Sequence, residues 1–272
     1  MSTVTSADGT LIAFDRFGDG PPVILAAGAF NDRSATEPLA RALEPRFTLL
    51  NYDRRGRGGS GDTAPYSVQR EIEDIDALIS AAGAPAAVFG YSSGASLALQ
   101  AAASGLQISK LVLYEPPFNP DDSYPTLPGD LASRLAELVA AGRRGDAVEL
   151  YQITAVGMPA SVVEQMRHAP FRPSLEAIAH TLTYDAAVVG DRSLPAGLIG
   201  SIHVPALVIS GDQSPPFLQA AARAVTDALP QRRLHVLAGQ GHDIDPEATA
   251  SVIADFLGTE PGGSSARPPD VP

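Results

Sequence analysis

The sequence of 272 residues predicts an α/β protein with a mostly parallel, doubly wound sheet of about eight strands. Two observations lead to this fold class. First, short continuous apolar runs, typical of strands buried on both faces, alternate with longer amphipathic stretches that are typical of helices. Second, this alternation stops after Tyr114 and resumes near residue 203, which predicts an insertion between two strands of the sheet.

The first two strands are expected at residues 2–6 and 10–17. They should form an antiparallel hairpin, because Asp8-Gly9 favours a tight turn between them. The remaining strands are expected at residues 23–27, 47–52, 86–91, 110–114, 206–210 and 234–237. Helices are expected between and after these strands, at residues 68–81, 93–103, 217–228 and 246–257.

The domain organisation follows from the interruption. Residues 1–115 and 203–259 are predicted to form one core domain, and residues 116–202 a helical cap inserted after strand six. The insertion begins with a proline-rich stretch and continues with helical patterns near residues 130–141, 145–156, 160–168 and 174–180. Residues 260–272 are rich in Pro, Gly and Ser, a composition that predicts a disordered tail.

Composition narrows the possible functions. The 44% hydrophobic and 18% charged content is that of a globular protein. No apolar run reaches the roughly 18 residues that a membrane span needs, and the start has no secretory pattern, so we expect a cytoplasmic protein that does not bind membranes. The absence of cysteine excludes disulfides, thiol catalysis and cysteine metal sites. A net charge of −12 argues against nucleic acid as a partner and favours a small-molecule substrate.

The most informative motif is Gly90-Tyr91-Ser92-Ser93-Gly94, which matches G-x-S-x-G. It follows an apolar strand and opens a helix, which is the setting that this nucleophile motif requires. A serine on such a strained turn projects its hydroxyl above the sheet, and its neighbours two positions away must be small. Ser92 is therefore the candidate nucleophile. The Ser93 amide, at the positive end of the helix, is a candidate donor to an oxyanion.

The chain resembles the α/β-hydrolase superfamily from about residue 3 to residue 258. Besides the serine motif, Asp53-Arg54-Arg55-Gly56-Arg57-Gly58-Gly59-Ser60 is similar to the family's D-x-R-G-x-G-x-S loop, which is a scaffold signature. The stretch from Pro205 to Gly211 resembles the strand that precedes the usual acid. Gly239-Gln240-Gly241-His242 resembles the usual histidine loop. The resemblance implies an α/β-hydrolase fold and a serine-nucleophile enzyme with a helical cap.

His242 is the candidate base among five histidines. It lies in a glycine-rich loop after the final strand, and this fold has its nucleophile before its histidine. An imidazole at that place can take the serine proton and later return it to the leaving group.

The acid departs from the family pattern, because the position of the usual aspartate is Ser214. Two carboxylates could replace it. Glu115 ends the strand before the cap, where some superfamily members carry their acid, and Asp212 lies two positions before Ser214. Glu115 is favoured, since the carboxyl edge of a parallel sheet is where catalytic groups gather. Asp212 and the absence of any acid remain alternatives.

The second oxyanion donor is predicted at Ala29. The family usually shows His-Gly-x after strand three, and this chain has Ala27-Gly28-Ala29, but a backbone amide does not depend on its side chain. The residues predicted to contact substrate are Phe30, Tyr91, Phe118, His180 and Tyr184. Asp185 is a further polar candidate in the cap, as a substrate contact or as part of a structural network. No pattern indicates a metal site or a cofactor.

These observations predict a cofactor-independent serine hydrolase that cleaves an ester or lactone of a small organic molecule through an acyl-enzyme. Two alternatives stay open, because fold and triad do not decide the reaction. One is a non-hydrolytic or C–C bond-cleaving enzyme, such as a lyase or a perhydrolase-like protein. The other is a catalytically weak protein that binds a small ligand. The sequence does not indicate an oligomeric state.

Overall fold

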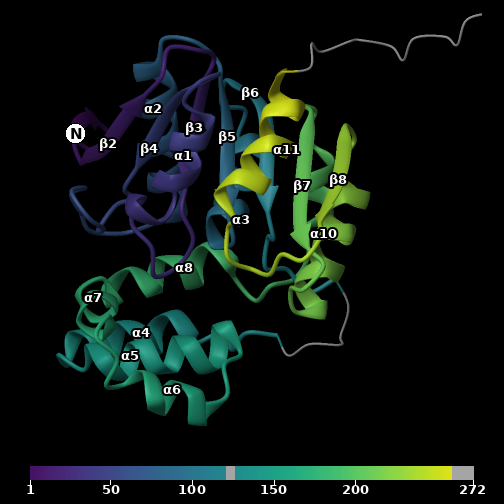
Figure 1. Cartoon of the computed structure of the whole chain (residues 1–272). Coiled ribbons are helices and arrows are strands. Elements are labelled where there is room, and N and C mark those ends of the chain that lie inside the picture. The colour runs from purple at the N-terminus through teal and green to yellow at the C-terminus, as the bar shows by residue number, and fades with distance from the viewer. Residues whose placement is uncertain (121–125, 259–272) are drawn as a thin grey trace, which may run out of the picture.

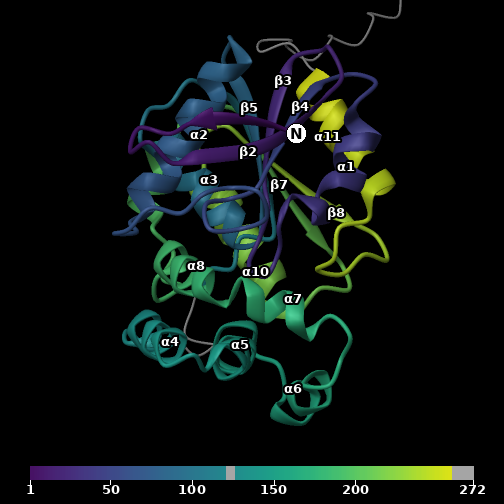
Figure 2. The ribbon, with the colours of Figure 1, turned by 90° about the vertical axis from the view of Figure 1, so that its left-hand side faces the viewer.

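A computed structural model describes residues 1–120 and 126–258. Its centre is a sheet of eight strands in the order β1-β2-β4-β3-β5-β6-β7-β8 (Figures 1 and 2). β1 and β2 pair antiparallel, as do β2 and β4, and the other neighbours are parallel. The strands are Ser2–Thr5 (β1), Leu11–Phe17 (β2), Pro22–Ala26 (β3), Thr48–Tyr52 (β4), Ala86–Tyr91 (β5), Ile108–Tyr114 (β6), Ala206–Gly211 (β7) and Arg232–Leu237 (β8). The predicted fold class is confirmed.

Helices cover both faces of this sheet. The helices α2 (Val68–Ala82), α3 (Ser93–Ala103) and α10 (Pro216–Ala228) contribute to one apolar core. The helices α1 (Glu37–Leu43) and α11 (Pro246–Gly258) contribute to a second core on the opposite face. Because both faces are covered, the central strands are apolar throughout, and β4 is buried along its whole length.

Helix α2 shows how the sequence determines one of these elements. Its buried residues Ile72, Ile75, Leu78 and Ile79 are three or four positions apart and therefore lie on one face of the helix. The helix ends at Gly83, which has a φ of 74° and caps it in the left-handed conformation that glycine tolerates best. The same amphipathic pattern predicted this helix from the sequence.

The chain between β6 and β7 contains a separate group of helices. They are α4 (Leu131–Ala140), α5 (Arg144–Tyr151), a π-helical turn (Gln152–Val156), α6 (Ala160–Met166), α7 (Arg172–Ala177), a 3₁₀ turn (Ala179–Thr181), α8 (Leu182–Val189) and α9 (Ala196–Gly200). Most of these helices share a third apolar cluster, and α8 contacts both α3 and α4. In Figures 1 and 2, α4, α5 and α6 lie beyond one end of the sheet, with α8 nearer to it.

The sequence patterns missed two of these helices. α8 and α9 lie where no helix was predicted, and the pattern at residues 145–156 corresponds to α5 and the π-helical turn together. The predicted tail, residues 260–272, lies outside the described residues. Within residues 1–120 and 126–258, no helix combines the length and the apolar character needed to cross a membrane.

Candidate active site

Ser92 occupies a sharp turn between β5 and α3. Its φ of 55° lies in the left-handed region, and its amide donates to the Tyr114 carbonyl at 2.9 Å. The turn requires the glycines on either side. A Cβ at Gly90 would lie 2.4 Å from the Gly94 carbonyl oxygen, and one at Gly94 would lie 2.3 Å from that of Ala26. The G-x-S-x-G spacing therefore produces the strained serine turn that the motif describes.

His242 lies in the loop between β8 and α11. This loop packs closely against the end of β7, where a Cβ at Gly211 would lie 2.1 Å from the Gln240 carbonyl oxygen. The Tyr114 hydroxyl donates to the Gly241 carbonyl at 3.0 Å, and the Tyr91 ring lies 5.1 Å from the imidazole, centroid to centroid. The loop is thus held against the ends of β5, β6 and β7.

Glu115 follows β6 and is completely buried. Its Oε2 lies 2.6 Å from His242 Nδ1, and its Oε1 accepts from the Gly211 amide at 2.8 Å and the Ser210 hydroxyl at 3.1 Å. Burial alone would raise the pKa of Glu115, but the hydrogen bonds with His242 and the Gly211 amide more than offset this and lower it. The carboxylate is therefore ionised and can orient the imidazole and stabilise its charged form.

Asp212, the alternative acid, is exposed and points elsewhere. Its Oδ1 accepts from the Gly239 amide at 2.7 Å and from the Gln213 side chain at 3.1 Å. Ser214, at the family's usual acid position, is buried, and its hydroxyl has no hydrogen bond of good geometry within residues 1–120 and 126–258, although it is close enough to favour the charged form of Glu115 and so to lower its pKa. Of the two candidate acids, only Glu115 contacts His242.

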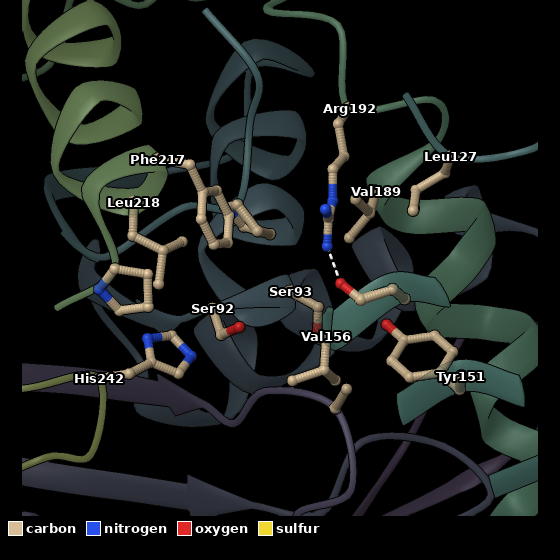
Figure 3. A pocket seen from close by; sticks show the side chains of 14 residues that line it. Ser92, Ser93, Leu127, Tyr151, Val156, Val189, Arg192, Phe217, Leu218 and His242 are labelled. Atoms are coloured by element: carbon tan, nitrogen blue, oxygen red, sulfur yellow. Dashed lines mark hydrogen bonds between the residues drawn. The ribbon is translucent and has the colours of Figure 1, made fainter. Parts of the chain in front are cut away.

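Ser92 and His242 line the same cavity, which has a volume of about 210 Å³. Figure 3 shows the two side chains next to each other on one side of it. Among the described residues no hydrogen bond joins the Ser92 hydroxyl to His242, and such bonds often tighten only when substrate is bound. The other lining residues are mostly apolar: Ala29, Ser93, Pro117, Leu127, Tyr151, Ala155, Val156, Val189, Arg192, Pro215, Phe217 and Leu218.

The loop after β3 carries the predicted oxyanion donor. Ala29 and Ser93 both line the cavity beside Ser92. Gly28 lets the loop approach the serine, because a Cβ there would lie 3.1 Å from Ser92 Cβ. Two arginines hold the loop through its carbonyl groups: Arg57 donates to the Gly28 carbonyl at 2.7 Å and Arg54 to the Ala27 carbonyl at 3.3 Å. These bonds support the loop where the usual histidine is replaced by Ala27.

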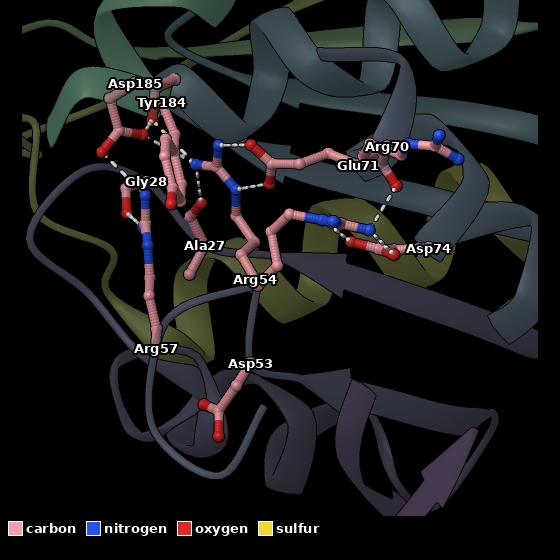
Figure 4. A network of polar contacts seen from close by, with 12 residues as sticks. Ala27, Gly28, Asp53, Arg54, Arg57, Arg70, Glu71, Asp74, Tyr184 and Asp185 are labelled. Atoms are coloured by element: carbon pink, nitrogen blue, oxygen red, sulfur yellow. Dashed lines mark hydrogen bonds and ion pairs between the residues drawn. The ribbon is translucent and has the colours of Figure 1, made fainter. Parts of the chain in front are cut away.

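Those arginines belong to a buried ionic network (Figure 4). Asp185 on α8 pairs with Arg54 at 2.8 Å and Arg57 at 2.7 Å, and Arg54 also pairs with Glu71 on α2 at 2.6 Å. Burial would raise the pKa of both carboxyls, but the neighbouring guanidinium groups lower it. The Ser93 hydroxyl donates to Asp185 at 2.8 Å. Asp185 therefore joins α8 to both loops that carry the candidate oxyanion amides.

The five residues predicted to contact substrate lie outside the cavity lining. The Phe30 ring packs edge-on against Tyr151, and Tyr91 packs against Tyr114 and His242. Phe118 is buried in the core that α3 and α10 share. Tyr184 stacks on Tyr66 and donates to Asp62 at 2.7 Å, and His180 lies 3.7 Å from the same carboxylate. Burial lowers the pKa of His180 despite that neighbour.

Sequence reasoning missed the residues that line the far side of the cavity. Tyr151 and Arg192 come from the helical insertion, and Phe217 from the start of α10. Their sequence surroundings carry no catalytic or binding motif. The sequence indicated only that these three residues lie in or next to segments that flank the ends of the strands.

Comparison with known proteins agrees with this architecture. The sequence model of the Alpha/beta hydrolase family matches residues 23–255. The chain belongs to this family. A solved alpha/beta hydrolase from Sphaerobacter thermophilus is 51% identical, with a TM-score of 0.89, and the match covers 94% of this chain and 100% of that one.

Two further relatives carry more specific names. The 2-(acetamidomethylene)succinate hydrolase of Mesorhizobium japonicum is 27% identical over 254 residues, which are 88% of this chain and 89% of that protein. The enol-lactonase of Burkholderia xenovorans shares the fold, with a TM-score of 0.70 and 23% identity over 94% of this chain and 99% of that one. The family and the name of the Mesorhizobium relative support a hydrolase.

Proposed function

We propose that the protein is a cofactor-independent serine hydrolase that cleaves a carboxylic ester or lactone of a small organic molecule. The observation that carries the proposal is the buried Glu115 carboxylate 2.6 Å from His242 Nδ1, with His242 and Ser92 on the same cavity wall. With Nδ1 bound to Glu115 and no hydrogen bond to Nε2 among the described residues, Nε2 of the imidazole can serve as base toward the serine. The small, mostly apolar cavity suits a small organic substrate. The Mesorhizobium relative is likewise named for a small organic substrate, a succinate derivative.

The reaction follows from these positions. Ser92 Oγ attacks the carbonyl carbon while His242 Nε2 takes its proton, and the charge of the imidazolium is balanced by Glu115. The Ala29 and Ser93 amides stabilise the negative oxygen of the tetrahedral intermediate. His242 returns the proton to the alkoxide leaving group as the C–O bond breaks. Water, deprotonated by His242, then attacks the acyl-enzyme, and the imidazolium gives that proton to Ser92 Oγ as the acyl–oxygen bond breaks and the acid is released.

Kinetics of three variants test the proposal with methyl esters of short carboxylic acids. Ser92→Ala should abolish hydrolysis, and Glu115→Gln should lower kcat by at least a hundredfold, since the amide cannot balance the imidazolium charge. Asp212→Asn is the matched control and should lower kcat only mildly. Full activity in Ser92→Ala, or a larger loss in Asp212→Asn than in Glu115→Gln, would contradict the assignment.

A further inference from the structure

Arg192 enters the cavity from the side opposite His242 (Figure 3). It follows α8, where Gly190 and Arg192 both have positive φ values of 60° and 70°. This tight turn directs the long side chain inward, and only 9% of the residue is exposed. A cationic group thus faces the same cavity as the candidate nucleophile.

The charge of Arg192 has no acidic partner among the described residues. One terminal nitrogen donates to the Ala155 carbonyl, and the guanidinium lies 5.6 Å from the centre of the Phe217 ring. Its Nε is buried with no hydrogen-bond partner in the described part of the chain. Burial lowers the pKa of Arg192, and only Tyr151 opposes that shift. An arginine nevertheless stays protonated in proteins, so its charge must be accommodated.

The other buried arginines of the described residues differ from Arg192 in having an acidic partner. Each of them pairs with at least one carboxylate: Arg54 with Glu71, Arg55 with Asp74, Arg57 with Asp185 and Arg172 with Glu149. Burying an isolated charge is costly. Such a cost persists in a protein where the group has a use, and no carboxylate of the described residues supplies the anion, so we look for it in what fills the cavity.

Tyr151 adds a second donor on the same side. It lines the cavity beside Arg192, and no hydrogen bond engages its hydroxyl within the described residues. Burial raises the pKa of Tyr151, so its phenol stays protonated and can donate. A guanidinium and a phenol are together suited to the two oxygens of a carboxylate.

We propose that Arg192, with Tyr151, binds a free carboxylate of the substrate, so that the preferred substrate is a small ester or lactone that carries a second, ionised carboxyl group. The inference rests on the proposed function, because it assigns the substrate class of the same site. The carboxylate lies at the Arg192 end of the cavity and the scissile carbonyl lies at Ser92. Cleavage of such a substrate releases a dicarboxylate and an alcohol, or a hydroxy-dicarboxylate from a lactone.

Matched ester pairs test this directly. Monomethyl glutarate and methyl pentanoate have acyl chains of equal length and differ in a terminal carboxylate, as do monomethyl succinate and methyl butanoate. In the wild type, kcat/KM for the anionic ester should exceed that for its neutral partner at least tenfold in one pair. Arg192→Met should reduce this ratio at least tenfold, mainly through KM, and Arg192→Lys should retain part of it. Arg134→Gln, which alters an exposed arginine on α4, should leave the ratio unchanged.

A wild type without preference for either anionic ester would overturn the inference, as would an Arg192→Met variant that slows both esters of a pair equally. Calorimetric binding of glutarate separates this failure from failure of the proposed function. Ser92→Ala should bind glutarate as the wild type does, and Arg192→Met should bind it at least tenfold more weakly. If no ester is hydrolysed but glutarate binding depends on Arg192, the carboxylate site stands and the hydrolase proposal fails. Glutarate binding that is absent, or equal in Arg192→Met, contradicts the site.

Discussion

The buried arginines that hold the loop after β3 differ in their counter-charges from the buried arginine that lines the cavity. Arg54 and Arg57 donate to carbonyls of the loop after β3 and share the Asp185 carboxylate, while Arg192 lines the cavity without an acidic partner among the described residues. The paired group holds backbone carbonyls in place and needs no ligand. We infer from this difference that Arg192, and not Arg54 or Arg57, is the buried arginine that binds a ligand.

Removing the Asp185 carboxylate, which Arg54 and Arg57 share, should have the largest effect on stability. Asp185→Asn would leave Arg57 without an ion pair and Arg54 with Glu71 alone. We expect the free energy of unfolding, measured in urea, to fall by about 3–5 kcal/mol, because one partner of a buried pair is removed.

The matched control is Glu37→Gln, since Glu37 pairs with Arg41 on the exposed face of α1 at 3.4 Å. That change should cost less than about 0.5 kcal/mol. Similar losses in the two variants would mean that the buried network contributes no more to stability than a surface pair.

Low pH should also remove the stabilisation that the Glu71 and Asp185 carboxylates give to the buried ion pairs. The pKa values of Glu71 and Asp185 are lowered in the folded protein, so their contribution to stability is fully present above the unfolded value of about 4. It is lost as the pH falls through the lower folded values. We therefore expect Tm to drop steeply below about pH 4, and to drop less steeply in Asp185→Asn, which has one titrating group fewer. Equal slopes in both proteins would contradict this assignment.

The smallest expected effect is a gain in stability, in contrast to the losses above. Arg192→Met replaces an unpaired buried cation with an apolar side chain of similar length, at the loss of the bond to the Ala155 carbonyl. We expect the free energy of unfolding to rise by about 0.5–2 kcal/mol, as when a functional group that destabilises a site is removed. A loss of stability comparable to that of Asp185→Asn would place Arg192 among the structural arginines.

The sequence predicted the parts of this molecule that depend on local patterns. The strands around Ser92 followed from apolar runs, and the nucleophile turn from a motif within five residues. His242 and Glu115 could be placed because each follows a recognisable strand and the carboxyl ends of parallel strands meet at one edge. Their roles as base and acid remain predictions for the experiments above.

The features that the sequence did not predict depend on contacts between segments that are distant in the chain. Asp185 lies on α8, which no pattern predicted, and its partner Arg54 is 131 positions away in the sequence. Arg192 follows the same helix, and the absence of a partner cannot be seen in a linear pattern. Phe118 and Tyr184, which we predicted as substrate contacts, instead face the core and the loop around Asp62. Residue type alone did not specify the direction in which these side chains point.

In the proposed mechanism, Ser92 is a nucleophile that His242 and Glu115 activate. Intact-mass labelling with a fluorophosphonate measures that activation without knowledge of the substrate. We predict one adduct per wild-type chain, none on folded Ser92→Ala, much slower labelling of Glu115→Gln, and near wild-type labelling of Asp212→Asn. An adduct that persists in Ser92→Ala, or folded wild-type protein that stays unlabelled, would contradict the account.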